Sequence, residues 1–506
     1  MALRDCAVVV LAAGKGTRLK SRLAKVLHRV GGRPLVEHTM RACLPLEPAT
    51  IVVVVGHQAA EVRAVVEPFG AKTVLQEPQL GTGHALLMAQ RALEGCARCA
   101  LVLPGDAPLV RTGTLLGLTN AHSQGRAAVT ILTAKLDDPT GYGRILRKRD
   151  GSVAAIIEEK AASAELRAIR EVNSSIYVFT LEKLWPVLAH LKPQNVHREL
   201  YLTDAIALLD SRGECILAEV APDPREILGC NTRAELAHVD RILRENKRAE
   251  AMEAGATLCL PETILIDPDV EIGPDTVIEP GVQLLGATRV GPGCTVRAGS
   301  VLVDTVLEEG VVVKQNCHIA GSWLGAGVQV GPFAHIRDGA ELRAGSRVGN
   351  FVEVKKSTLG EGVKAMHLSY LGDARIGPKS NIGAGTITCN YDGVRKNPTT
   401  IGAHVFVGSG TELVAPVNVG DGAYIAAGST ITEDVPSNAL AIARERQVTK
   451  PGWAAEHRKQ TGAGADVAKD GPSARSAVSS KTASPNGQRG PKASRKPARR
   501  KKVSRR

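Results

Sequence analysis

Aromatic residues are scarce in this sequence, and long apolar runs are absent. Phe, Trp and Tyr make up 3% of the 506 residues, while hydrophobic residues together reach 43%. Such a chain can bury substantial cores, but it must build them almost entirely from Val, Ile, Leu and Ala. Stacked β repeats suit that composition better than a globular domain with a mixed aromatic core. No apolar run approaches the roughly 20 residues that are needed to span a bilayer.

Cysteine pairs are also lacking. The ten cysteines are scattered, and the close pair Cys96-x-x-Cys99 has no second pair with which to complete a zinc site. The apolar segment 6–13 runs directly into Gly14-Lys15-Gly16-Thr17-Arg18 without a small-residue cleavage site, so we interpret it as a buried strand and not as a signal peptide. We therefore expect a cytoplasmic protein with reduced thiols.

A basic bias is missing from most of the chain. Residues 457–506 hold 15 Lys and Arg against Asp466 and Asp470, and this excess equals the whole net charge of +13. Residues 455–506 are rich in Ser, Ala, Gly, Pro, Lys and Arg without an apolar period, which predicts a disordered basic tail. The tail is either a solubilising extension or a nonspecific contact for nucleic acid or another anionic surface. The lack of interleaved aromatics favours the first reading.

Two architectures follow one another in the chain. Residues 1–230 alternate helical stretches with apolar runs such as 7–11, 51–55 and 100–103, which is typical of a parallel sheet covered on both faces. Residues 231–254 predict one linker helix, capped by Asn231 or Thr232 and ended by Gly255. Its apolar face would consist of Leu236, Val239, Ile242 and Leu243.

Residues 255–454 show a sustained six-residue period. Aliphatic residues recur at Val330, Ile336, Leu342, Val348 and Val354, and again from Ile401 through Val407, Leu413, Val419, Ile425 and Ile431. A glycine often follows, and we expect it to ease the corner between two repeats. This period indicates a hexapeptide β-helix, because an α-helix would repeat every 3.6 residues and a hairpin strand every two.

The period fails in two places, and polar residues gather there. Val354 and Ile376 are 22 residues apart, and Thr388 and Ile401 are 13 apart. Interruptions of a regular scaffold are expected at functional sites. The first gap contains Lys355, Lys356, His367 and Tyr370, and the second contains Asn390, Tyr391, Arg395 and Lys396.

The glycine-rich segment after residue 10 predicts a phosphate-binding turn between a strand and a helix, with Arg18 and Lys25 to neutralise charge. A purely structural turn is the alternative. A Rossmann fingerprint would need Gly where Leu19 stands, and the spacing of a Walker A loop is absent.

Further motifs strengthen the nucleotide reading: Gln76, then Gln79-Leu80-Gly81-Thr82-Gly83, Gly105-Asp106-Ala107-Pro108, Gly141-Tyr142-Gly143-Arg144, Glu158, Asn173 and Asn231. This set resembles the sugar-phosphate nucleotidyltransferases, and among them the bifunctional N-acetylglucosamine-1-phosphate uridyltransferase/glucosamine-1-phosphate acetyltransferases, over residues 5–453. The resemblance implies a Rossmann-like α/β nucleotidyltransferase domain, then a left-handed parallel β-helix that carries the acetyltransferase. It also implies a role in UDP-N-acetylglucosamine synthesis for the cell wall.

For the first site, the resemblance implies in-line attack of N-acetylglucosamine-1-phosphate on the α-phosphate of UTP. Arg18 and Lys25 would be catalytic, and Asp106 with Asn231 would bind Mg²⁺. The uridine set would be Leu11, Ala12, Ala13, Gly14, Gln76, Gly81 and Thr82, and the sugar set Gly143, Glu158 and Asn173. The family usually has Pro where this chain has Ala24.

For the second site, the resemblance implies acetyl transfer from acetyl-CoA to glucosamine-1-phosphate. His367 would be the general base, and Asn390 would position either the acetyl carbonyl or His367. Sugar-phosphate contacts would be Arg337, Lys355, Tyr370, Asn381 and Lys396. Coenzyme A contacts would be Ala384, Asn390, Tyr391, Ser409, Ala427 and Arg444.

A homotrimer is also implied by the resemblance, since hexapeptide acyltransferases place acyl sites at subunit boundaries. The competing hypothesis is a uridyltransferase alone, with the β-helix as an inert trimerisation scaffold. The intact set of His367, Asn390, Lys355 and Lys396 favours two activities. Cys389, next to Asn390, could suggest a ping-pong route, which no family motif supports.

Overall fold

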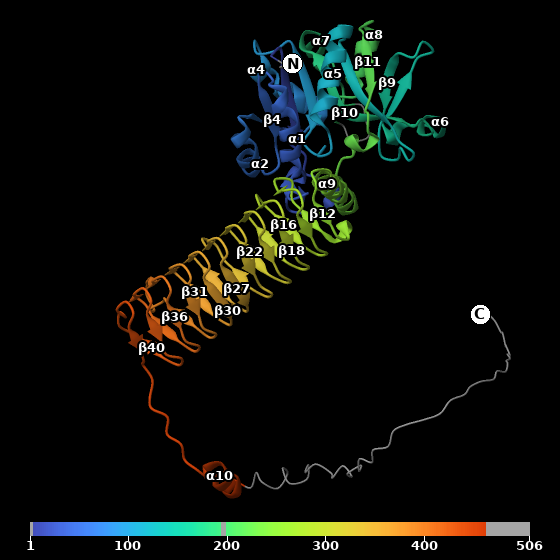
Figure 1. The fold of residues 1–506 in the computed structure, drawn as a ribbon. Helices are drawn as coiled ribbons and strands as arrows, with labels where there is room; N and C mark the ends of the chain where they lie inside the picture. Colours follow the sequence, from blue (N-terminus) through green and yellow to red (C-terminus); the bar gives the residue numbers. More distant parts are fainter. Residues whose placement is uncertain (1–3, 194–198, 462–506) are drawn as a thin grey trace, which may run out of the picture. The chain divides into compact units, whose positions relative to one another are not determined.

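A computed structural model describes residues 4–193 and 199–461. The chain divides into a compact unit that ends at Arg444 and a C-terminal segment that begins at Glu445. Within the compact unit, a mixed α/β domain is followed by one long helix and then by a solenoid of short parallel strands (Figure 1). In the described part of the chain, no helix has the length and apolar character to cross a membrane.

The α/β domain is built on a nine-stranded sheet. Seven strands lie in the order β11-β7-β10-β6-β1-β4-β5, and β8 (Arg144–Arg147) and β9 (Val153–Ile157) form a ribbon beside β10. The predicted apolar runs are confirmed as strands. The bounds are β1 Cys6–Ala12, β4 Ile51–Val55, β5 Lys72–Leu75, β6 Cys99–Pro104, β7 Val129–Lys135, β10 Glu171–Thr180 and β11 Ile216–Val220.

Both faces of the sheet are covered, as the continuous apolar strands predict. Val8 and Val10 of β1 pack with helices on one face, and Ala7 and Val9 pack with helices on the other. The first face holds α1 (Leu35–Cys43), α2 (Ala59–Val66) and α5 (Thr112–Gly125); the second holds α3 (Thr82–Met88), α7 (Leu181–Leu188) and α8 (Asp204–Ser211).

The sheet is mixed, whereas the sequence predicts a parallel one. β10 runs antiparallel to both β6 and β7, while β1 is parallel to β4 and β6. After the end of β7, the chain forms the β8–β9 ribbon outside the main path of the sheet. It then returns at the same end of the strands, so that Glu171 at the start of β10 pairs with Lys135 at the end of β7. A strand that begins where its neighbour ends must run antiparallel to that neighbour.

The predicted linker helix is confirmed as α9, Arg233–Glu253. Thr232 is its N-cap and accepts a hydrogen bond from the Glu235 backbone, as expected of a threonine at that position. Leu236, Val239 and Ile242 are buried. The helix ends before Gly255, whose φ of 96° suits glycine.

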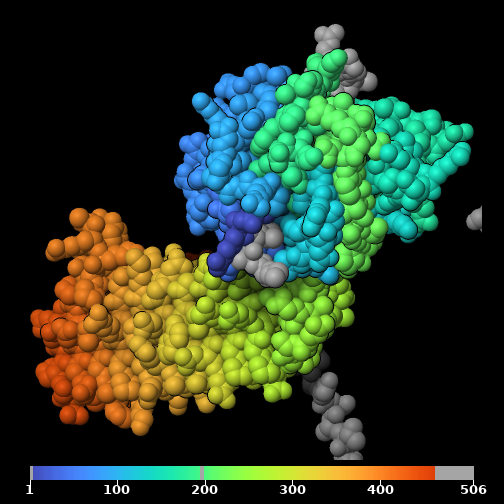
Figure 2. Space-filling view, turned by 90° about the horizontal axis from the view of Figure 1, so that it is seen from above, coloured from blue at the N-terminus to red at the C-terminus, as the bar shows by residue number. Residues whose placement is uncertain are grey.

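The solenoid is a parallel β-helix with three sheets. They run from β12 (Thr257–Leu258) to β41 (Leu440–Ala441), from β13 (Leu265–Ile266) to β40 (Thr430–Ile431), and from β14 (Glu271–Ile272) to β38 (Val417–Val419). Successive coils pair in register, so that residues of equal rank form columns along the solenoid. Figure 2 shows the outer surface of these coils, coloured from green through yellow to orange.

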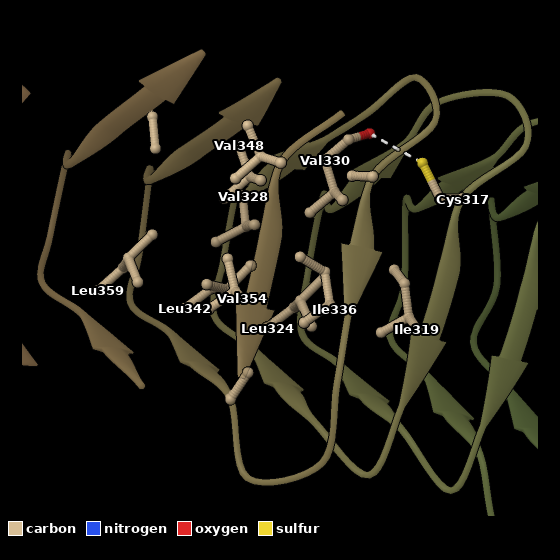
Figure 3. Packing of buried hydrophobic residues seen from close by; sticks show 14 of the residues in the cluster. Cys317, Ile319, Leu324, Val328, Val330, Ile336, Leu342, Val348, Val354 and Leu359 are labelled. Atoms are coloured by element: carbon tan, nitrogen blue, oxygen red, sulfur yellow. Dashed lines mark hydrogen bonds between the residues drawn. The ribbon is translucent and has the colours of Figure 1, made fainter. Parts of the chain in front are cut away.

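The predicted aliphatic positions form the core of the β-helix. Val330, Ile336, Leu342, Val348 and Val354 are at most 1% exposed, and Figure 3 shows them pointing into the space between the sheets. The second predicted run, from Ile401 to Ile431, is buried as well. Aliphatic side chains therefore fill an interior that has little room for aromatic rings.

The glycines that follow these positions act differently from the prediction. A Cβ on Gly349 would lie 1.8 Å from the Met366 carbonyl oxygen, and one on Gly408 would lie 2.4 Å from the Ala427 nitrogen. Neither residue has a positive φ. Gly349 and Gly408 are needed because adjacent coils approach closely, whereas Gly331, which follows Val330, has a positive φ of 94°.

The two predicted interruptions differ in kind. Across the first, buried residues continue at steps of five or six, through Leu359, Ala365 and Leu371. The shortened corner after Lys355 is bridged by the buried Ser357 hydroxyl, which donates to the Lys355 carbonyl and accepts from the Ala374 nitrogen. The prediction of a break there is therefore wrong: two shortened corners change the spacing, and no loop is inserted.

The second interruption is a true insertion. Residues 390–398 leave the coil after β34 (Ile387–Cys389), and the bond from the Asn397 nitrogen to the Asn390 carbonyl closes the loop. Tyr391 and Lys396 form an isolated antiparallel bridge within it.

The C-terminal segment differs from the predicted tail at its start. Helix α10 spans Trp453–Thr461, so residues 455–461 are helical. Ala, Glu, Arg, Lys and Gln in this stretch are good helix formers, which the reading by composition overlooked. The rest of the predicted disordered tail, residues 462–506, lies outside the described residues.

Candidate active sites

The α/β domain holds two adjoining cavities at the edge of the sheet where the parallel strands end. Their volumes are 590 and 430 Å³. Lys25, Pro104, Asp106, Glu158 and Ser175 line both cavities, so the two spaces meet at these side chains. A ligand that extends from one cavity into the other would pass all five residues.

Glycines let the backbone approach the first cavity. Gly16 has a φ of 68°, and a Cβ there would lie 2.6 Å from the Lys25 Cβ. Gly81 has a φ of 104°, and a Cβ there would lie 2.7 Å from the Leu200 carbonyl oxygen. A side chain at either position would strain the turn and push the lining apart. The Gln76 side chain donates to the Gly81 carbonyl over 2.9 Å and holds the second turn in place.

Opposite charges converge where the cavities meet. The Lys25 Nζ lies 2.5 Å from the Asp106 Oδ2 and 2.6 Å from the Asn231 Oδ1. Arg18 also donates to the Asn231 Oδ1, over 2.8 Å. Two cationic side chains therefore lie beside two hard oxygen ligands, an arrangement that suits a phosphate chain together with a divalent cation.

Glu158 forms one wall shared by both cavities. Its Oε1 accepts a hydrogen bond from the Thr203 hydroxyl over 3.0 Å. Burial raises the pKa of this carboxyl, and the Thr203 hydrogen bond opposes that shift. Thr203 therefore fixes the Glu158 side chain and favours its charged form.

The β-helix carries a second group of polar side chains on its surface. Asn350 at the end of β27 (Arg347–Asn350) pairs in register with His367 at the end of β30 (Lys364–His367). The Asn350 Oδ1 lies 3.0 Å from the His367 Nδ1. An amide oxygen can only accept, so Nδ1 carries the proton and Nε2 keeps its lone pair.

A column of small residues continues from His367 along the coils. Four residues of successive coils pair with one another: Ala365, Ile382, Val407 and Ile425. The residues that lie two positions after them, His367, Ala384, Ser409 and Ala427, therefore occupy equivalent positions in their coils. Arg444 donates to the Ala427 carbonyl over 2.7 Å at the far end of this column. The result is a shallow strip that leads from the imidazole to a cation.

Basic residues face the neighbouring sheet. Arg337 donates to the Glu353 Oε1 over 2.7 Å, and the pairing of Ile336 with Val354 places Arg337 beside Lys355. Lys396 from the inserted loop lies beside Lys355, and the hydrogen bond between the two amino groups, together with the charge of Lys396, lowers the pKa of Lys355. Like charges held close together are stabilised by an anion such as a phosphate.

Asn390 is hydrogen-bonded near Tyr370 and Asp373 and not to the imidazole. Its Nδ2 donates to the Asp373 Oδ2 over 2.5 Å and lies 3.4 Å from the Tyr370 hydroxyl. Gly372 makes this contact possible, because a Cβ there would lie 2.4 Å from the Tyr370 oxygen. The residue that contacts His367 is Asn350, which the sequence interpretation did not single out.

Comparisons with known proteins agree with this two-part geometry. The MobA-like NTP transferase domain family matches residues 8–193, and the bacterial transferase hexapeptide (six repeats) family matches residues 269–303 and 398–433. "Bifunctional protein GlmU" of Koribacter versatilis is 47% identical over 461 residues, which cover 90% of this chain and 98% of that protein. "Bifunctional protein GlmU" of Trichlorobacter lovleyi is 48% identical over 456 residues, covering 89% and 98%. The chain belongs to the GlmU family.

Most residues predicted for the first site line its cavities. Leu11, Ala13, Gly14, Gln76, Gly81 and Thr82 line the first cavity, and Arg18, Gly143, Asn173 and Asn231 line the second. Ala12 does not line either one, because its side chain packs in the sheet core at 1% exposure. The roles assigned to these residues within the GlmU family stay predictions.

Several lining residues were not predicted. Ser175, Tyr177, Tyr201 and Thr203 line the first cavity, and Tyr142 and Glu235 line the second. The segment 199–203 reaches the cavity through tertiary folding, since the Gly83 nitrogen donates to the Leu200 carbonyl. Tyr142 stands inside the Gly141-Tyr142-Gly143-Arg144 motif, but no local motif marks the other residues in the sequence.

Two side-chain oxygens at the junction of the cavities could bind Mg²⁺. Asp106 and Asn231 supply oxygen ligands that already contact one cation, the Lys25 ammonium. Among the described residues, no group of three or more His, Cys, Asp or Glu side chains could hold a metal ion. Two protein oxygens nevertheless fit Mg²⁺, which usually binds one or two carboxylates together with substrate phosphates and water.

Proposed function

We propose that this chain makes UDP-N-acetylglucosamine through two separate sites. The β-helix site acetylates glucosamine-1-phosphate with acetyl-CoA, and the α/β site joins the product to the uridylyl group of UTP and releases pyrophosphate. The observation that carries the proposal is the presence of both constellations in one chain: Lys25, Asp106 and Asn231 in contact, and His367 paired with Asn350. Membership of the GlmU family supports the same pair of reactions.

In the first reaction, a sugar-phosphate oxygen attacks the α-phosphorus of UTP, and the bond to pyrophosphate breaks. No covalent intermediate with the protein is needed. Arg18 and Lys25 neutralise charge on the phosphates, and the glycine-rich turn at Gly14 brings backbone N–H groups close to them. Gly143, Glu158 and Asn173 hold the sugar, so that the two substrates meet at the junction of the cavities.

Asp106 and Asn231 would hold Mg²⁺, and the bound ion would neutralise phosphate charge and polarise the phosphoryl group. Lys25 would then move from the two oxygens to the phosphates, since both contacts are made through its flexible end.

In the second reaction, the His367 Nε2 takes a proton from the ammonium group of glucosamine-1-phosphate. The free amine attacks the thioester carbonyl, a C–N bond forms, and the C–S bond to coenzyme A breaks. Asn350 holds the imidazole in the tautomer that this step requires. Arg337, Lys355 and Lys396 bind the phosphate, and Tyr370 and Asn381 contact the sugar. The strip from Ala384 to Arg444 receives coenzyme A, with Asn390 and Tyr391 of the inserted loop as further contacts.

We further propose a homotrimer and these domain bounds: uridyltransferase 1–230, linker helix 231–254 and acetyltransferase 255–454. The His367 strip lies on the outside of one β-helix, with His367, Ser409 and Ala427 exposed, and a neighbouring subunit would wall it in. Light scattering should give a mass about three times the 53.2 kDa of one chain. A mass of one chain would contradict the trimer.

The function is tested by an assay with one substrate omitted at a time. Purified protein receives glucosamine-1-phosphate, acetyl-CoA, UTP and Mg²⁺. We expect UDP-N-acetylglucosamine from the full mixture, and coenzyme A release even without UTP. If product forms only from ready-made N-acetylglucosamine-1-phosphate, the β-helix is a scaffold and the second activity is absent.

A further inference from the structure

A bulge in β10 lies beside the junction of the two cavities. The register of β10 against β7 shifts between Asn173 and Tyr177. In the middle of the shift, Ser175 has a φ of 64°, in the left-handed region that residues other than glycine seldom adopt. Bulges beside active sites commonly re-aim one side chain, and a strained backbone at such a place suggests a function.

The bulge is fixed on both sides of Ser175. The Ser174 hydroxyl donates to the Leu132 carbonyl over 2.6 Å and accepts from the Ile176 nitrogen over 3.0 Å. The Ser175 nitrogen donates to the Asn173 Oδ1 over 3.1 Å. These bonds hold the Ser175 backbone in place, so the direction of its Cα–Cβ bond is set.

That direction is into the substrate space. Ser175 is exposed although Asn173, Ser174, Ile176 and Tyr177 around it are buried. It lines both cavities, together with Glu158 and the charged pair Lys25 and Asp106. Among residues at this junction, Ser175 is a short hydroxyl carrier, which can both donate to and accept from a sugar.

Neighbouring groups orient the hydroxyl. The Asn173 amide is fixed by its bond from the Ser175 nitrogen, so its Nδ2 donates to the Tyr177 oxygen over 2.8 Å. The Ser175 hydroxyl interacts with the same Tyr177 oxygen. Asn173, Tyr177 and Ser175 thus form one connected network on the sugar side of the junction.

We propose that the Ser175 hydroxyl contacts the sugar of the sugar phosphate and sets the affinity of the first site for that substrate. The inference rests on the proposed uridyl transfer and adds a specificity residue that the sequence motifs do not include. The sugar, and not the uridine, is the partner, because Ser175 is bonded to Asn173 and lines both cavities together with Glu158, and these two residues are the ones proposed to hold the sugar.

The test uses the full-length protein with the variants Ser175→Ala and Ser175→Gly. Both remove the hydroxyl, and the glycine variant also relieves the positive φ, so at least one of them should fold without strain. We expect both variants to raise KM for N-acetylglucosamine-1-phosphate by about fivefold to tenfold, because one hydrogen bond to the substrate is lost. KM for UTP and kcat should stay within about twofold of the wild-type values. Ser211→Ala, an exposed serine that lines neither cavity, is the matched control.

Acetyl transfer on the same preparations reports that the chain is intact. A wild-type KM for the sugar phosphate in Ser175→Ala would overturn the contact, and so would an equal rise in both KM values. A change in Ser175→Gly alone would show that only the backbone matters, which also overturns it. Wild-type protein that releases no pyrophosphate from UTP would instead refute the proposed function, and the two failures are therefore distinguishable.

Discussion

The two candidate sites are assembled in opposite ways. In the α/β domain, Lys25 meets Asn231 across 206 residues of sequence, and the contact exists only because separate strands end at one edge of a sheet. In the β-helix, His367 meets Asn350 across 17 residues, which is one coil. A repeat therefore brings together residues that lie one coil apart, whereas the sheet brings together residues from opposite ends of its domain.

The largest effect is expected from His367→Ala. Loss of the base should lower the rate of acetyl transfer by 10²- to 10⁴-fold, the usual contribution of general base catalysis, and should leave uridyl transfer unchanged. Coenzyme A release and pyrophosphate release measure the two activities. His404→Asn, at an exposed corner of the same β-helix, is the control. Equal loss of both activities in His367→Ala would refute independent sites.

Asp106→Asn makes the reciprocal change. It keeps the shape of the side chain but removes the charge that faces Lys25, so uridyl transfer should fall about 10²- to 10³-fold and need more Mg²⁺. Acetyl transfer should stay at the wild-type level. The measurement is pyrophosphate release as a function of Mg²⁺, with Asp150→Asn on the exposed β8–β9 turn as control. A wild-type Mg²⁺ dependence would contradict the role of Asp106.

Two glycine variants of the β-helix distinguish the cost of a steric clash between coils from the cost of a positive φ. Gly349→Ala places a Cβ 1.8 Å from the Met366 oxygen, and we expect a loss of about 3 kcal/mol in the free energy of unfolding. Gly327→Ala meets nothing within 4 Å but adopts a φ of 67°, and should lose about 1 kcal/mol. Urea midpoints compare the two. A larger loss for Gly327→Ala would show that corner conformation limits the fold, and not the spacing of coils.

The smallest expected effect concerns Asn350. Asn350→Ala removes the acceptor for His367 Nδ1 and should lower kcat/KM for acetyl transfer about tenfold. Asn350→Asp keeps an acceptor for Nδ1 but places a carboxylate there, which stabilises the imidazolium by its negative charge. The acid limb of the pH–rate profile should then shift to higher pH. Identical profiles for both variants and the wild type would exclude a positioning role.

Sequence alone predicts much of this molecule because several of its signals are periodic or local. The six-residue period identifies the buried aliphatic residues from Val330 to Val354, and Thr232 marks the start of α9. The glycine turn at Gly14 and the Gly-Asp before Ala107 predict residues that do line the cavities. Each of these depends on neighbours within one repeat or one turn.

The missed features depend on tertiary contacts or on exact backbone geometry. The antiparallel direction of β10 follows from where the chain re-enters the sheet, and Thr203 reaches Glu158 only after α8 has packed. The corner at Ser357 is one residue shorter than the six-residue period requires, so a count of residues between aliphatic positions looks like a break in the solenoid. The glycine that follows several of the aliphatic residues looks like a turn residue, but at Gly349 and Gly408 it is needed because two coils approach closely, which no single repeat displays.

We expect one chain to carry two independent sites linked by a diffusible product. His367→Ala and Asp106→Asn should each fail to make UDP-N-acetylglucosamine from glucosamine-1-phosphate, acetyl-CoA and UTP. An equal mixture of the two variant proteins should restore synthesis, because each supplies the site that the other lacks. A mixture that stays as inactive as its components would contradict this account.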